Sequence, residues 1–275
     1  MQKEIKITNP DKIIYPKQKI KKIDIINYYV EVADLMLPYV ENRLLSVIRC
    51  HEGAGKECFF KKHPTTDKKM VNIKRDKDEE YFFINEKYQL IYQAQMGTIE
   101  FHTWGSSVAK INIPNMMVFD LDPDEELSLT KLRHAVLKVK SVLDELNLVS
   151  YLKTSGGKGY HIVVPFATSK NWDTFYDFSK QIALVVEDRW PKDFTTNLKK
   201  VERKGKNFID YLRNNRGSTC VAPYSLRARD NATISFPISW DDLGRIKPNE
   251  ITIKNYKKYL NNSWKDFFTI NQKLK

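Results

Sequence analysis

Hydrophobic and polar residues follow two different patterns along the chain, and the change lies near Pro114. Residues 23–40 carry apolar side chains at helical spacing, which predicts an amphipathic helix. Short runs rich in aromatic and β-branched residues come next, separated by charged or glycine-containing turns. Each of these runs predicts a β-strand: residues 44–50, 58–62, 81–84, 90–95 and 99–104. The first part of the chain is therefore expected to be a mixed α/β module dominated by antiparallel strands.

After Pro114 the predicted elements follow the order β-α-β-β-α-β. Strands are predicted at residues 116–119, 149–153, 161–165 and 208–212, and amphipathic helices at residues 128–146 and 171–190. This order describes the split βαβ, or ferredoxin-like, unit. In that unit the first strand lies between the third and fourth strands, and both run opposite to it. We expect an α+β fold: one domain of residues 1–275, made of an N-terminal module (1–113) and a ferredoxin-like module with a C-terminal extension (114–275).

Two carboxylates, Asp120 and Asp122, follow the first strand of the ferredoxin-like unit. Because strand side chains repeat with period two, both can point to the same side. Asp210 lies in the fourth strand, which borders the first, so the three side chains are expected to converge at one edge of the sheet. Such a group suits hard divalent cations, which take oxygen ligands and bridge to substrate phosphates. The alternative is that Asp120 and Asp122 are ordinary turn and cap residues.

A glycine-rich turn, Ser155-Gly-Gly-Lys-Gly-Tyr-His161, precedes the third strand. Its glycine spacing fits neither a Walker A loop nor a Rossmann fingerprint, and three glycines also describe an ordinary tight hairpin. However, Ser155, Lys158 and His161 bring polar and positive groups into one turn. These side chains, together with backbone N–H groups, can hold phosphates. Carboxylates for a metal beside a phosphate cradle suggest nucleotidyl transfer.

The charge of the chain indicates an anionic partner. It has 46 Lys and Arg residues against 34 Asp and Glu, a net charge of +12. Nucleic acid is the first candidate, because neutralising phosphates releases counterions and gives sequence-independent affinity. Arg227 and Arg229 follow the fourth strand and can donate two bonds at once to a phosphate, although solvated surface arginines are the alternative. One of the adjacent aromatics Phe59 and Phe60 is expected to face outward as a base-stacking platform.

The three cysteines, Cys50, Cys58 and Cys220, are expected to be free thiols in a reducing cytoplasm. The charged start of the chain predicts no signal peptide, and no apolar run approaches the length of a membrane span. Cys50, His51, Cys58 and His63 could also be interpreted as a zinc cluster. Their spacing matches no short paired-ligand motif, which disfavours zinc.

These motifs together resemble the polymerase domain of bacterial ligase D, a member of the archaeo-eukaryotic primase superfamily. The resemblance runs over nearly the whole chain and also includes four further segments: Asn9-Pro-Asp-Lys-Ile-Ile-Tyr-Pro16, Glu57-Cys-Phe-Phe-Lys61, Phe101-His-Thr-Trp-Gly-Ser106 and Ala222-Pro-Tyr-Ser-Leu-Arg227. It implies a primase-like catalytic core that adds nucleotides to DNA 3′ ends. The implied reaction depends on a template and on Mn²⁺ or Mg²⁺, prefers ribonucleotides and manganese, and fills gaps and processes ends in non-homologous end joining.

The resemblance also implies roles for individual residues. The metal-binding and catalytic carboxylates are Asp120, Asp122 and Asp210. The nucleotide-binding residues are His102, Ser155, Lys158, His161 and Arg227. The DNA-binding residues are Lys12 and Lys22 for a downstream 5′-phosphate, Phe59 and Phe60 beside the template, and the basic residues Arg203 and Arg229.

The implied partners are ribo- or deoxyribonucleoside triphosphates and DNA with gaps or double-strand-break ends that carry a 5′-phosphate. Ku and an ATP-dependent DNA ligase, in the same or a separate chain, are expected too, in the bacterial cytoplasm near the nucleoid. Two other functions stay open: a metal-dependent nuclease or phosphodiesterase, since two-metal sites also serve hydrolysis, and a non-catalytic DNA-end-binding module. No K-x-D-G adenylation motif is found, so we expect either a stand-alone polymerase or one domain of a longer protein.

Overall fold

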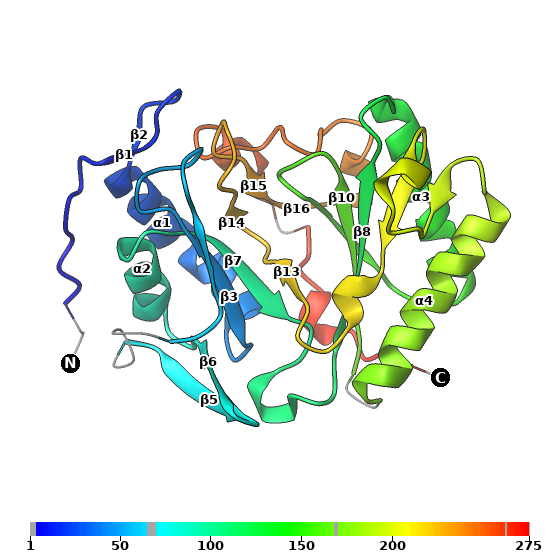
Figure 1. Cartoon of the computed structure of the whole chain (residues 1–275), viewed down its shortest axis with the longest axis horizontal. Coiled ribbons are helices and arrows are strands. Elements are labelled where there is room, and N and C mark those ends of the chain that lie inside the picture. Colours follow the sequence, from blue (N-terminus) through cyan, green and yellow to red (C-terminus); the bar gives the residue numbers. More distant parts are fainter. Residues whose placement is uncertain (1–3, 65–69, 168–169, 262, 275) are drawn as a thin grey trace.

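The computed structural model describes residues 4–64, 70–167, 170–261 and 263–274. Two sheets form its centre, each with helices packed on its outer side (Figure 1). The four-stranded sheet has the order β13-β7-β3-β4 and packs against α1 and α2. The six-stranded sheet has the order β11-β12-β8-β10-β9-β16 and packs against α3 and α4. The α+β fold class predicted from the sequence is confirmed by this architecture.

Most predicted elements of the first part are present. The hairpin β1 (Ile13–Tyr15) and β2 (Ile20–Lys21) leads into α1 (Lys22–Val40), whose apolar stripe is buried. The predicted strands at 44–50, 58–62 and 99–104 correspond to β3 (Leu45–Arg49), β4 (Phe59–Lys61) and β7 (Thr98–Trp104). The predicted strand at 81–84 belongs to a separate hairpin, β5 (Asn72–Asp76) with β6 (Glu79–Phe83).

The predicted strand at residues 90–95 is wrong, because this segment is the end of α2 (Lys87–Gln95). Leu90 and Ala94, one helical turn apart, are buried together. The side chain of Gln89 accepts the backbone N–H of Glu86 in a capping box that starts the helix. A short apolar run cannot by itself distinguish a strand from a helix, and here the cap decides.

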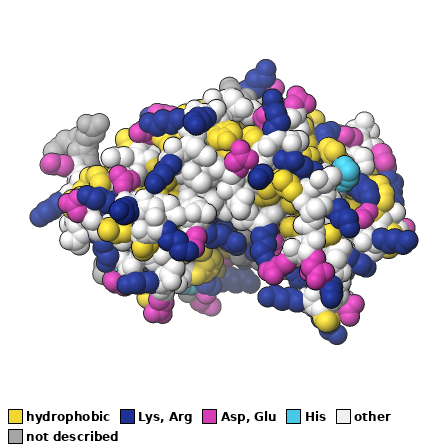
Figure 2. Space-filling model, turned by 90° about the horizontal axis from the view of Figure 1, so that it is seen from above, with side chains coloured by type: hydrophobic (Ala, Val, Ile, Leu, Met, Phe, Trp, Pro, Cys, Tyr) yellow, Lys and Arg dark blue, Asp and Glu magenta, His cyan; other side chains and the backbone are white. Residues whose placement is uncertain are grey.

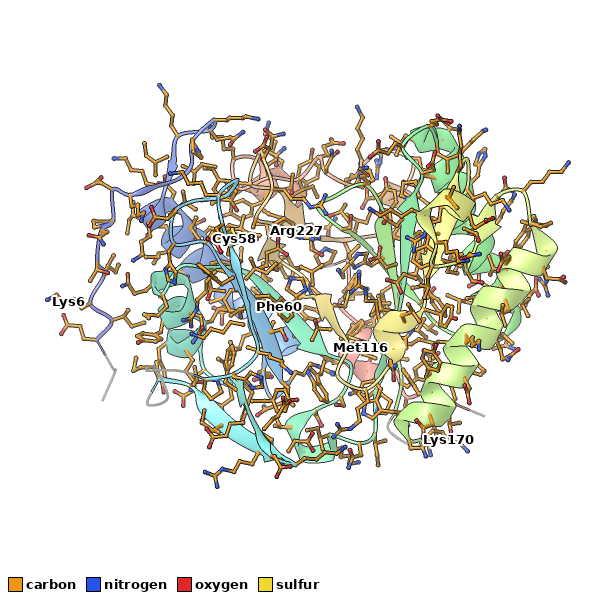
Figure 3. The ribbon with its side chains drawn as sticks, in the orientation of Figure 1. Lys6, Cys58, Phe60, Met116, Lys170 and Arg227 are labelled. Atoms are coloured by element: carbon orange, nitrogen blue, oxygen red, sulfur yellow. A yellow bond between two sulfur atoms is a disulfide. The ribbon has the colours of Figure 1, made fainter. Side chains whose placement is uncertain are left out.

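The expectation of three free thiols is wrong for two of them. Cys50 and Cys58 form a disulfide between the end of β3 and the start of β4, and Cys220 is free and buried. The bond also removes both thiolates that the alternative zinc cluster needed. Cys58, just before β4, and Phe60, within it, lie toward the middle of the molecule in Figure 3.

The ferredoxin-like order of the second part is confirmed. The central strand β8 (Met116–Pro123) pairs in antiparallel fashion with β10 (Tyr160–Pro165) on one side and β12 (Asn207–Asp210) on the other. Beyond β10 lies β9 (Tyr151–Thr154). The connecting helices are α3 (Leu129–Glu145) and α4 (Trp172–Arg189), and the sheet ends at β11 (Phe194–Thr195) and β16 (Pro237–Ile238).

The two sheets are joined by a segment from the later part of the chain. Strand β13 (Thr219–Val221) pairs with β7 of the four-stranded sheet, and the hairpin β14 (Ser225–Leu226) and β15 (Ile234–Ser235) follows it. The division into 1–113 and 114–275 stays a prediction. Short 3-10 turns complete the fold: η2 (Val108–Lys110), η3 (Lys200–Arg203), η4 (Leu212–Asn214), η5 (Trp240–Asp242), η6 (Tyr256–Tyr259) and η7 (Phe267–Thr269). None of the helices in the described ranges is long and apolar enough to cross a bilayer.

Candidate active site

A row of charged side chains crosses the middle of the six-stranded sheet. In the strand register, Asp120 of β8 lies opposite His161 of β10 and opposite Asp210 of β12, and His161 lies opposite Lys153 of β9. Residues that pair directly across strands point to the same face. Asp122, two residues beyond Asp120, points to that face as well. The structure therefore brings the three predicted carboxylates together on one side of the sheet.

The face that carries this row is the one not covered by helices. Met117, Phe119 and Leu121 alternate with the two aspartates along β8 and are fully buried. Their side of the sheet packs against α3 and α4. The opposite side is open to the cavity between the two sheets, and Asp120 and Asp122 line that cavity.

Asp120 and Asp210 are held by a shared arginine. Arg213 Nε lies 3.1 Å from Asp210 Oδ2, and Arg213 NH2 lies 3.9 Å from Asp120 Oδ2. His161 Nε2 is 3.3 Å from the other oxygen of Asp120. Burial alone would raise the pKa of Asp120, but its electrostatic and hydrogen-bond contact with His161 outweighs burial and lowers this pKa to about 2. Asp120 is thus ionised at neutral pH.

The other two carboxylates have the opposite shift. Burial and then the charge of Asp120 raise the pKa of Asp122. Burial also raises the pKa of Asp210, and the charge of Asp120 adds to this while Arg213 opposes it. The mutual repulsion of three close carboxylates is the condition that a bound cation relieves.

The carboxylates fit a divalent cation by their chemistry, although they are not arranged as a finished coordination shell. Across the described ranges, no group of three or more His, Cys, Asp and Glu side chains is gathered into a ready-made metal site. Arg213 and His161 occupy oxygens of Asp120 and Asp210 instead. The residues that would hold a divalent cation here are Asp120, Asp122 and Asp210, since they offer only oxygen ligands.

The glycine-rich turn brings Ser155, Lys158 and His161 to the same cavity, but its amides are largely occupied. Ser155 Oγ accepts the N–H groups of Gly157 at 3.0 Å and Gly159 at 3.2 Å. The N–H of Gly156 donates to the carbonyl of Pro248 at 3.0 Å. The expectation that backbone N–H groups of this turn bind phosphate is therefore wrong for the amides of Gly156, Gly157 and Gly159, which already have acceptors in the protein. Side chains are left to bind phosphate, among them Lys158, which is exposed and pairs with Glu125.

The cavity between the two sheets has a volume of about 900 Å³. All five predicted nucleotide-binding residues line it, with Asp120, Asp122, Arg203 and Arg229, whereas Asp210 is not among the lining residues. Its Lys and Arg side chains are Lys158, Lys200, Arg203, Lys204, Arg213, Arg227 and Arg229. Basic residues are not confined to this cavity: Lys and Arg side chains extend along the whole face seen in Figure 2, with acidic ones among them. A large cavity lined by seven Lys and Arg residues against five Asp and Glu residues suits a polyphosphate substrate that brings cations with it.

The remaining predicted DNA contacts lie outside the cavity lining. Lys12 pairs with Glu52 at 3.1 Å, and the ammonium of Lys22 donates to the carbonyl of Thr8 at 2.7 Å. The two lysines are close: burial and then the charge of Lys12 lower the pKa of Lys22. Such a pair of like charges is a place where an anion is stabilised.

Both aromatic residues of β4 are exposed, Phe59 by 49% and Phe60 by 60%. One of them was expected to face outward, and the structure exposes the second as well. Strand β4 is an edge strand, since β3 is its one neighbour in the four-stranded sheet. Phe60 lies 6.4 Å from the ring of His102, centre to centre, so this aromatic surface borders the cavity side of the sheet.

Sequence reasoning missed four residues at this site. Arg213 bridges two carboxylates, Lys153 donates to His161, Cys220 Sγ lies 3.3 Å from His161 Nδ1, and Glu100 bonds to His102 and Arg227. For three of them a signal existed. Glu100 and Lys153 are single charged residues inside apolar strands, and Arg213 follows Asp210 by three residues on a turn. Cys220 had no such signal.

Comparison with known proteins agrees with this geometry. The family model described as the LigD primase-polymerase domain matches residues 21–268. The chain belongs to the LigD primase-polymerase domain family. The predicted resemblance is thereby confirmed, and with it the class of enzyme, a nucleotidyltransferase of the polymerase and primase type.

Relatives of this LigD-family chain are longer proteins. It is 33% identical to the multifunctional non-homologous end joining protein LigD of Pseudomonas aeruginosa over 98% of this chain and 34% of that protein. It is 31% identical to the bifunctional LigD of Bacillus subtilis over 87% of this chain and 39% of that protein. The chain therefore spans about a third of the length of these curated relatives.

A solved structure shares the fold. The polymerase domain from Mycobacterium tuberculosis ligase D, in complex with DNA, superimposes with a TM-score of 0.85 at 26% sequence identity. The match covers 93% of this chain and 94% of that one. The two-sheet arrangement described above is thus the fold of a LigD polymerase domain.

Proposed function

We propose that the chain catalyses template-dependent transfer of nucleotides to DNA 3′ ends, filling gaps and processing broken ends in bacterial non-homologous end joining. The observation that carries the proposal is the row of carboxylates beside a cavity of about 900 Å³ with many basic residues: Asp120 and Asp122 line this cavity, and Asp210 lies directly opposite Asp120 on the neighbouring strand. Carboxylates for cations and a basic cavity for a triphosphate are the two parts that this chemistry needs. Membership of the LigD primase-polymerase family supports the same reaction.

The proposed division of labour follows from position and charge. Asp120, Asp122 and Asp210 would hold divalent cations, Mn²⁺ in preference to Mg²⁺. When bound, such ions supply the activation of the attacking 3′-hydroxyl and the stabilisation of the leaving pyrophosphate. His102, Ser155, Lys158, His161 and Arg227 would bind the incoming nucleotide, with ribonucleotides preferred. Lys158 and Arg227 would supply positive charge to this cavity, and Arg227 contacts the carbonyl of Ser155.

The DNA is proposed to approach along the basic and aromatic residues outside the triphosphate cavity. Lys12 and Lys22 would bind the 5′-phosphate of the downstream strand, Phe59 and Phe60 would lie beside the template, and Arg203 and Arg229 would contact the DNA backbone. Arg203 is held for this role by bonds to the carbonyls of Asn197 and Leu198. Ku and an ATP-dependent ligase, in the bacterial cytoplasm, are the proposed protein partners, because the relatives of this chain are multifunctional non-homologous end joining proteins.

Primer extension on a gapped duplex tests the proposal. The wild-type chain is incubated with a labelled primer, a template with a short gap, a downstream strand carrying a 5′-phosphate, ribonucleoside triphosphates and Mn²⁺. We expect templated addition to the primer, and we expect Asp120→Ala to lose at least about a hundredfold of the rate, as removal of a metal-binding carboxylate does.

Asp188→Ala is the matched control, because Asp188 is an exposed aspartate on α4, outside the cavity lining. It should extend the primer at the wild-type rate. Absence of extension by the wild-type chain, or equal extension by Asp120→Ala, would contradict the proposal. Shortening of the primer in place of extension would indicate a nuclease.

A further inference from the structure

Glu100 is a buried carboxylate that connects two of the nucleotide-binding side chains. It lies in β7 between the buried residues Ile99 and Phe101 and is itself only 3% exposed. An ionised carboxylate in such a place is costly unless charge and hydrogen bonds compensate it. The partners that compensate this cost therefore indicate the role of Glu100.

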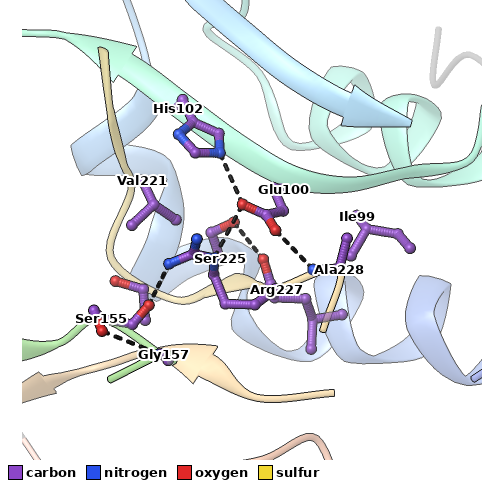
Figure 4. A network of polar contacts seen from close by, with 12 residues as sticks. Ile99, Glu100, His102, Ser155, Gly157, Val221, Ser225, Arg227 and Ala228 are labelled. Carbon is purple, nitrogen blue, oxygen red and sulfur yellow. Dashed lines mark hydrogen bonds and ion pairs between the residues drawn. The ribbon is translucent and has the colours of Figure 1, made fainter. Parts of the chain in front are cut away.

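Three donors surround the two oxygens of Glu100 (Figure 4). Oε2 accepts from His102 Nε2 at 2.9 Å and from Arg227 Nε at 3.0 Å. Oε1 accepts the backbone N–H of Ala228 at 2.7 Å. Burial raises the pKa of Glu100, but the bond with His102 and the charge of Arg227 outweigh it and lower the pKa to about 2. The side chain is a carboxylate at every pH at which a polymerase works.

The same contact extends to the glycine-rich turn. Arg227 NH1 donates to the carbonyl of Ser155, so a single chain of bonds runs from His102 through Glu100 and Arg227 to this turn. Gly156 leaves room for it: a Cβ there would lie 2.7 Å from Arg227 Cγ. This series of hydrogen bonds connects the four-stranded sheet, which carries His102, with the six-stranded sheet, which carries the carboxylates.

The bond to Glu100 also determines which atoms His102 offers to a ligand. A neutral imidazole has one N–H donor and one lone-pair acceptor. Burial lowers the pKa of His102, with the Glu100 bond opposing this, so the ring is neutral at neutral pH. Because Oε2 of Glu100 can only accept, Nε2 carries the proton and Nδ1 is the acceptor. In Figure 4 the second ring nitrogen points away from Glu100.

We infer that Glu100 is a positioning residue of the nucleotide site, which fixes Arg227 as a phosphate donor and His102 as an acceptor for a sugar hydroxyl. A phosphate oxygen has no proton to give to Nδ1, whereas a ribose hydroxyl has one. The inference rests on the proposed function, because it presumes that the cavity takes a nucleoside triphosphate. It divides the cavity into a phosphate side, at Arg227 and Ser155, and a sugar side, at His102.

Glu100→Gln tests the positioning role, because glutamine keeps the shape of the side chain but replaces one of the two carboxylate oxygens by an NH2 group, which is a donor. Its amide cannot accept from His102, Arg227 and Ala228 together. We expect the Kd for ATP, measured by calorimetry without DNA, to rise about tenfold or more, as for loss of hydrogen bonds to a charged group. In primer extension, KM should rise by a similar factor while kcat falls much less, because the metal carboxylates are untouched.

A spectroscopic measurement separates positioning from a general structural role. The chain has five histidines, and the signals of His102 in ¹⁵N-labelled protein are identified by their loss in His102→Phe. We expect the His102 ring of the wild type to carry its proton on Nε2. In Glu100→Gln, the distribution of this proton between Nε2 and Nδ1 should change. Asp242→Asn is the control, because Asp242 is a buried carboxylate paired with Arg245 outside the cavity lining. It should alter stability but neither ATP affinity nor the His102 signals.

The sugar side is tested with 2′-deoxy-ATP and 3′-deoxy-ATP. One of the two should bind the wild-type chain about three- to tenfold more weakly than ATP, and this difference should vanish in His102→Phe. Equal discrimination in both chains, a proton on Nδ1 in the wild type, or unchanged ATP affinity in Glu100→Gln would overturn the inference. If the wild-type chain binds no ATP at all, the proposed function fails first, which is a distinct result.

Discussion

The ammonium group of Lys153 donates to Nδ1 of His161 over 2.8 Å, deep inside the protein. Lys153 is 1% exposed, and its other donors go to the carbonyl of Val221 at 3.0 Å and the hydroxyl of Ser235 at 2.7 Å. An ammonium has three N–H groups, and all three are thus used. With Nδ1 accepting, the proton of His161 is on Nε2 and points to Asp120. A buried lysine on the same face of the sheet therefore orients His161 toward the carboxylate row.

Burial lowers the pKa of Lys153 from 10.5 to about 8, which predicts a pH-dependent stability. Between these two values the unfolded chain binds a proton that the folded chain does not, so the free energy of unfolding should rise as pH increases from 8 to 10.5. The rise should be up to about 3 kcal/mol for this group. Urea titrations of the wild type and of Lys153→Met at several pH values measure it.

The comparison isolates Lys153 because the other ionisable groups are common to both proteins. Lys153→Met should lack this part of the rise, whereas Lys131→Met, at an exposed position on α3, should keep it. Parallel curves for the wild type and Lys153→Met would show that the buried amine does not titrate in this range.

A clash with the backbone makes Gly159 sensitive to the smallest substitution. A Cβ at this position would lie 1.8 Å from the carbonyl oxygen of Leu121, in the strand that carries Asp120 and Asp122. Gly159→Ala should therefore lower the free energy of unfolding by about 3 kcal/mol, the cost of a severe overpacking. Gly244→Ala is the matched control, because nothing lies within 4 Å of its Cβ. It should change stability by less than about 0.5 kcal/mol, and an equal effect of the two would refute the clash.

The carboxylate row was predictable because it depends on rules that the sequence obeys locally. The period of two places Asp120 and Asp122 on one face, and the ferredoxin-like order makes the strands of His161 and Asp210 neighbours of β8. Glu100 and Lys153 were not predicted. A single charged residue inside an apolar strand marks each of them as unusual, but their roles come from partners far along the chain, Arg227 for Glu100 and Ser235 for Lys153.

Local geometry explains the other differences. The amides of the glycine-rich turn were expected to face a ligand, yet Ser155 Oγ reaches two of them, since a hydroxyl two to four residues away competes for free N–H groups. The outward position of both Phe59 and Phe60 follows from the edge position of β4, which leaves neither face fully covered. Which strand lies at the edge of a sheet depends on strand pairing across the whole fold, so a local sequence pattern cannot predict it.

The disulfide between Cys50 and Cys58 is open to a direct test. Labelling of thiols in denatured protein should modify one cysteine, Cys220, without reductant and three after reduction. Because the bond closes a short loop, its reduction should lower the free energy of unfolding by about 2 kcal/mol. The variant with both Cys50 and Cys58 changed to serine should not respond to reductant. Three labelled thiols before reduction would rule the bond out.

The proximity of Lys12 and Lys22 predicts a specific role for the downstream 5′-phosphate. The backbone N–H of Lys22 donates to the carbonyl of Lys12 at 2.8 Å, and this bond holds the two residues next to each other. A phosphate between two ammonium groups offsets their repulsion, and its benefit should fall as salt rises, because screening weakens charge pairs. In gap-filling assays the wild type should extend a primer about tenfold faster when the downstream strand carries a 5′-phosphate, a gain within reach of two such contacts.

The double variant Lys12→Ala/Lys22→Ala should reduce this ratio to nearly one while leaving extension on the unphosphorylated gap unchanged. Lys265→Ala removes an exposed lysine elsewhere on the surface and should keep the full ratio. If the double variant slows extension equally on both substrates, the two lysines attract DNA in general and do not recognise the phosphate. The ratio, measured at low and moderate salt, thus separates phosphate recognition from the overall attraction of a chain with a net charge of +12.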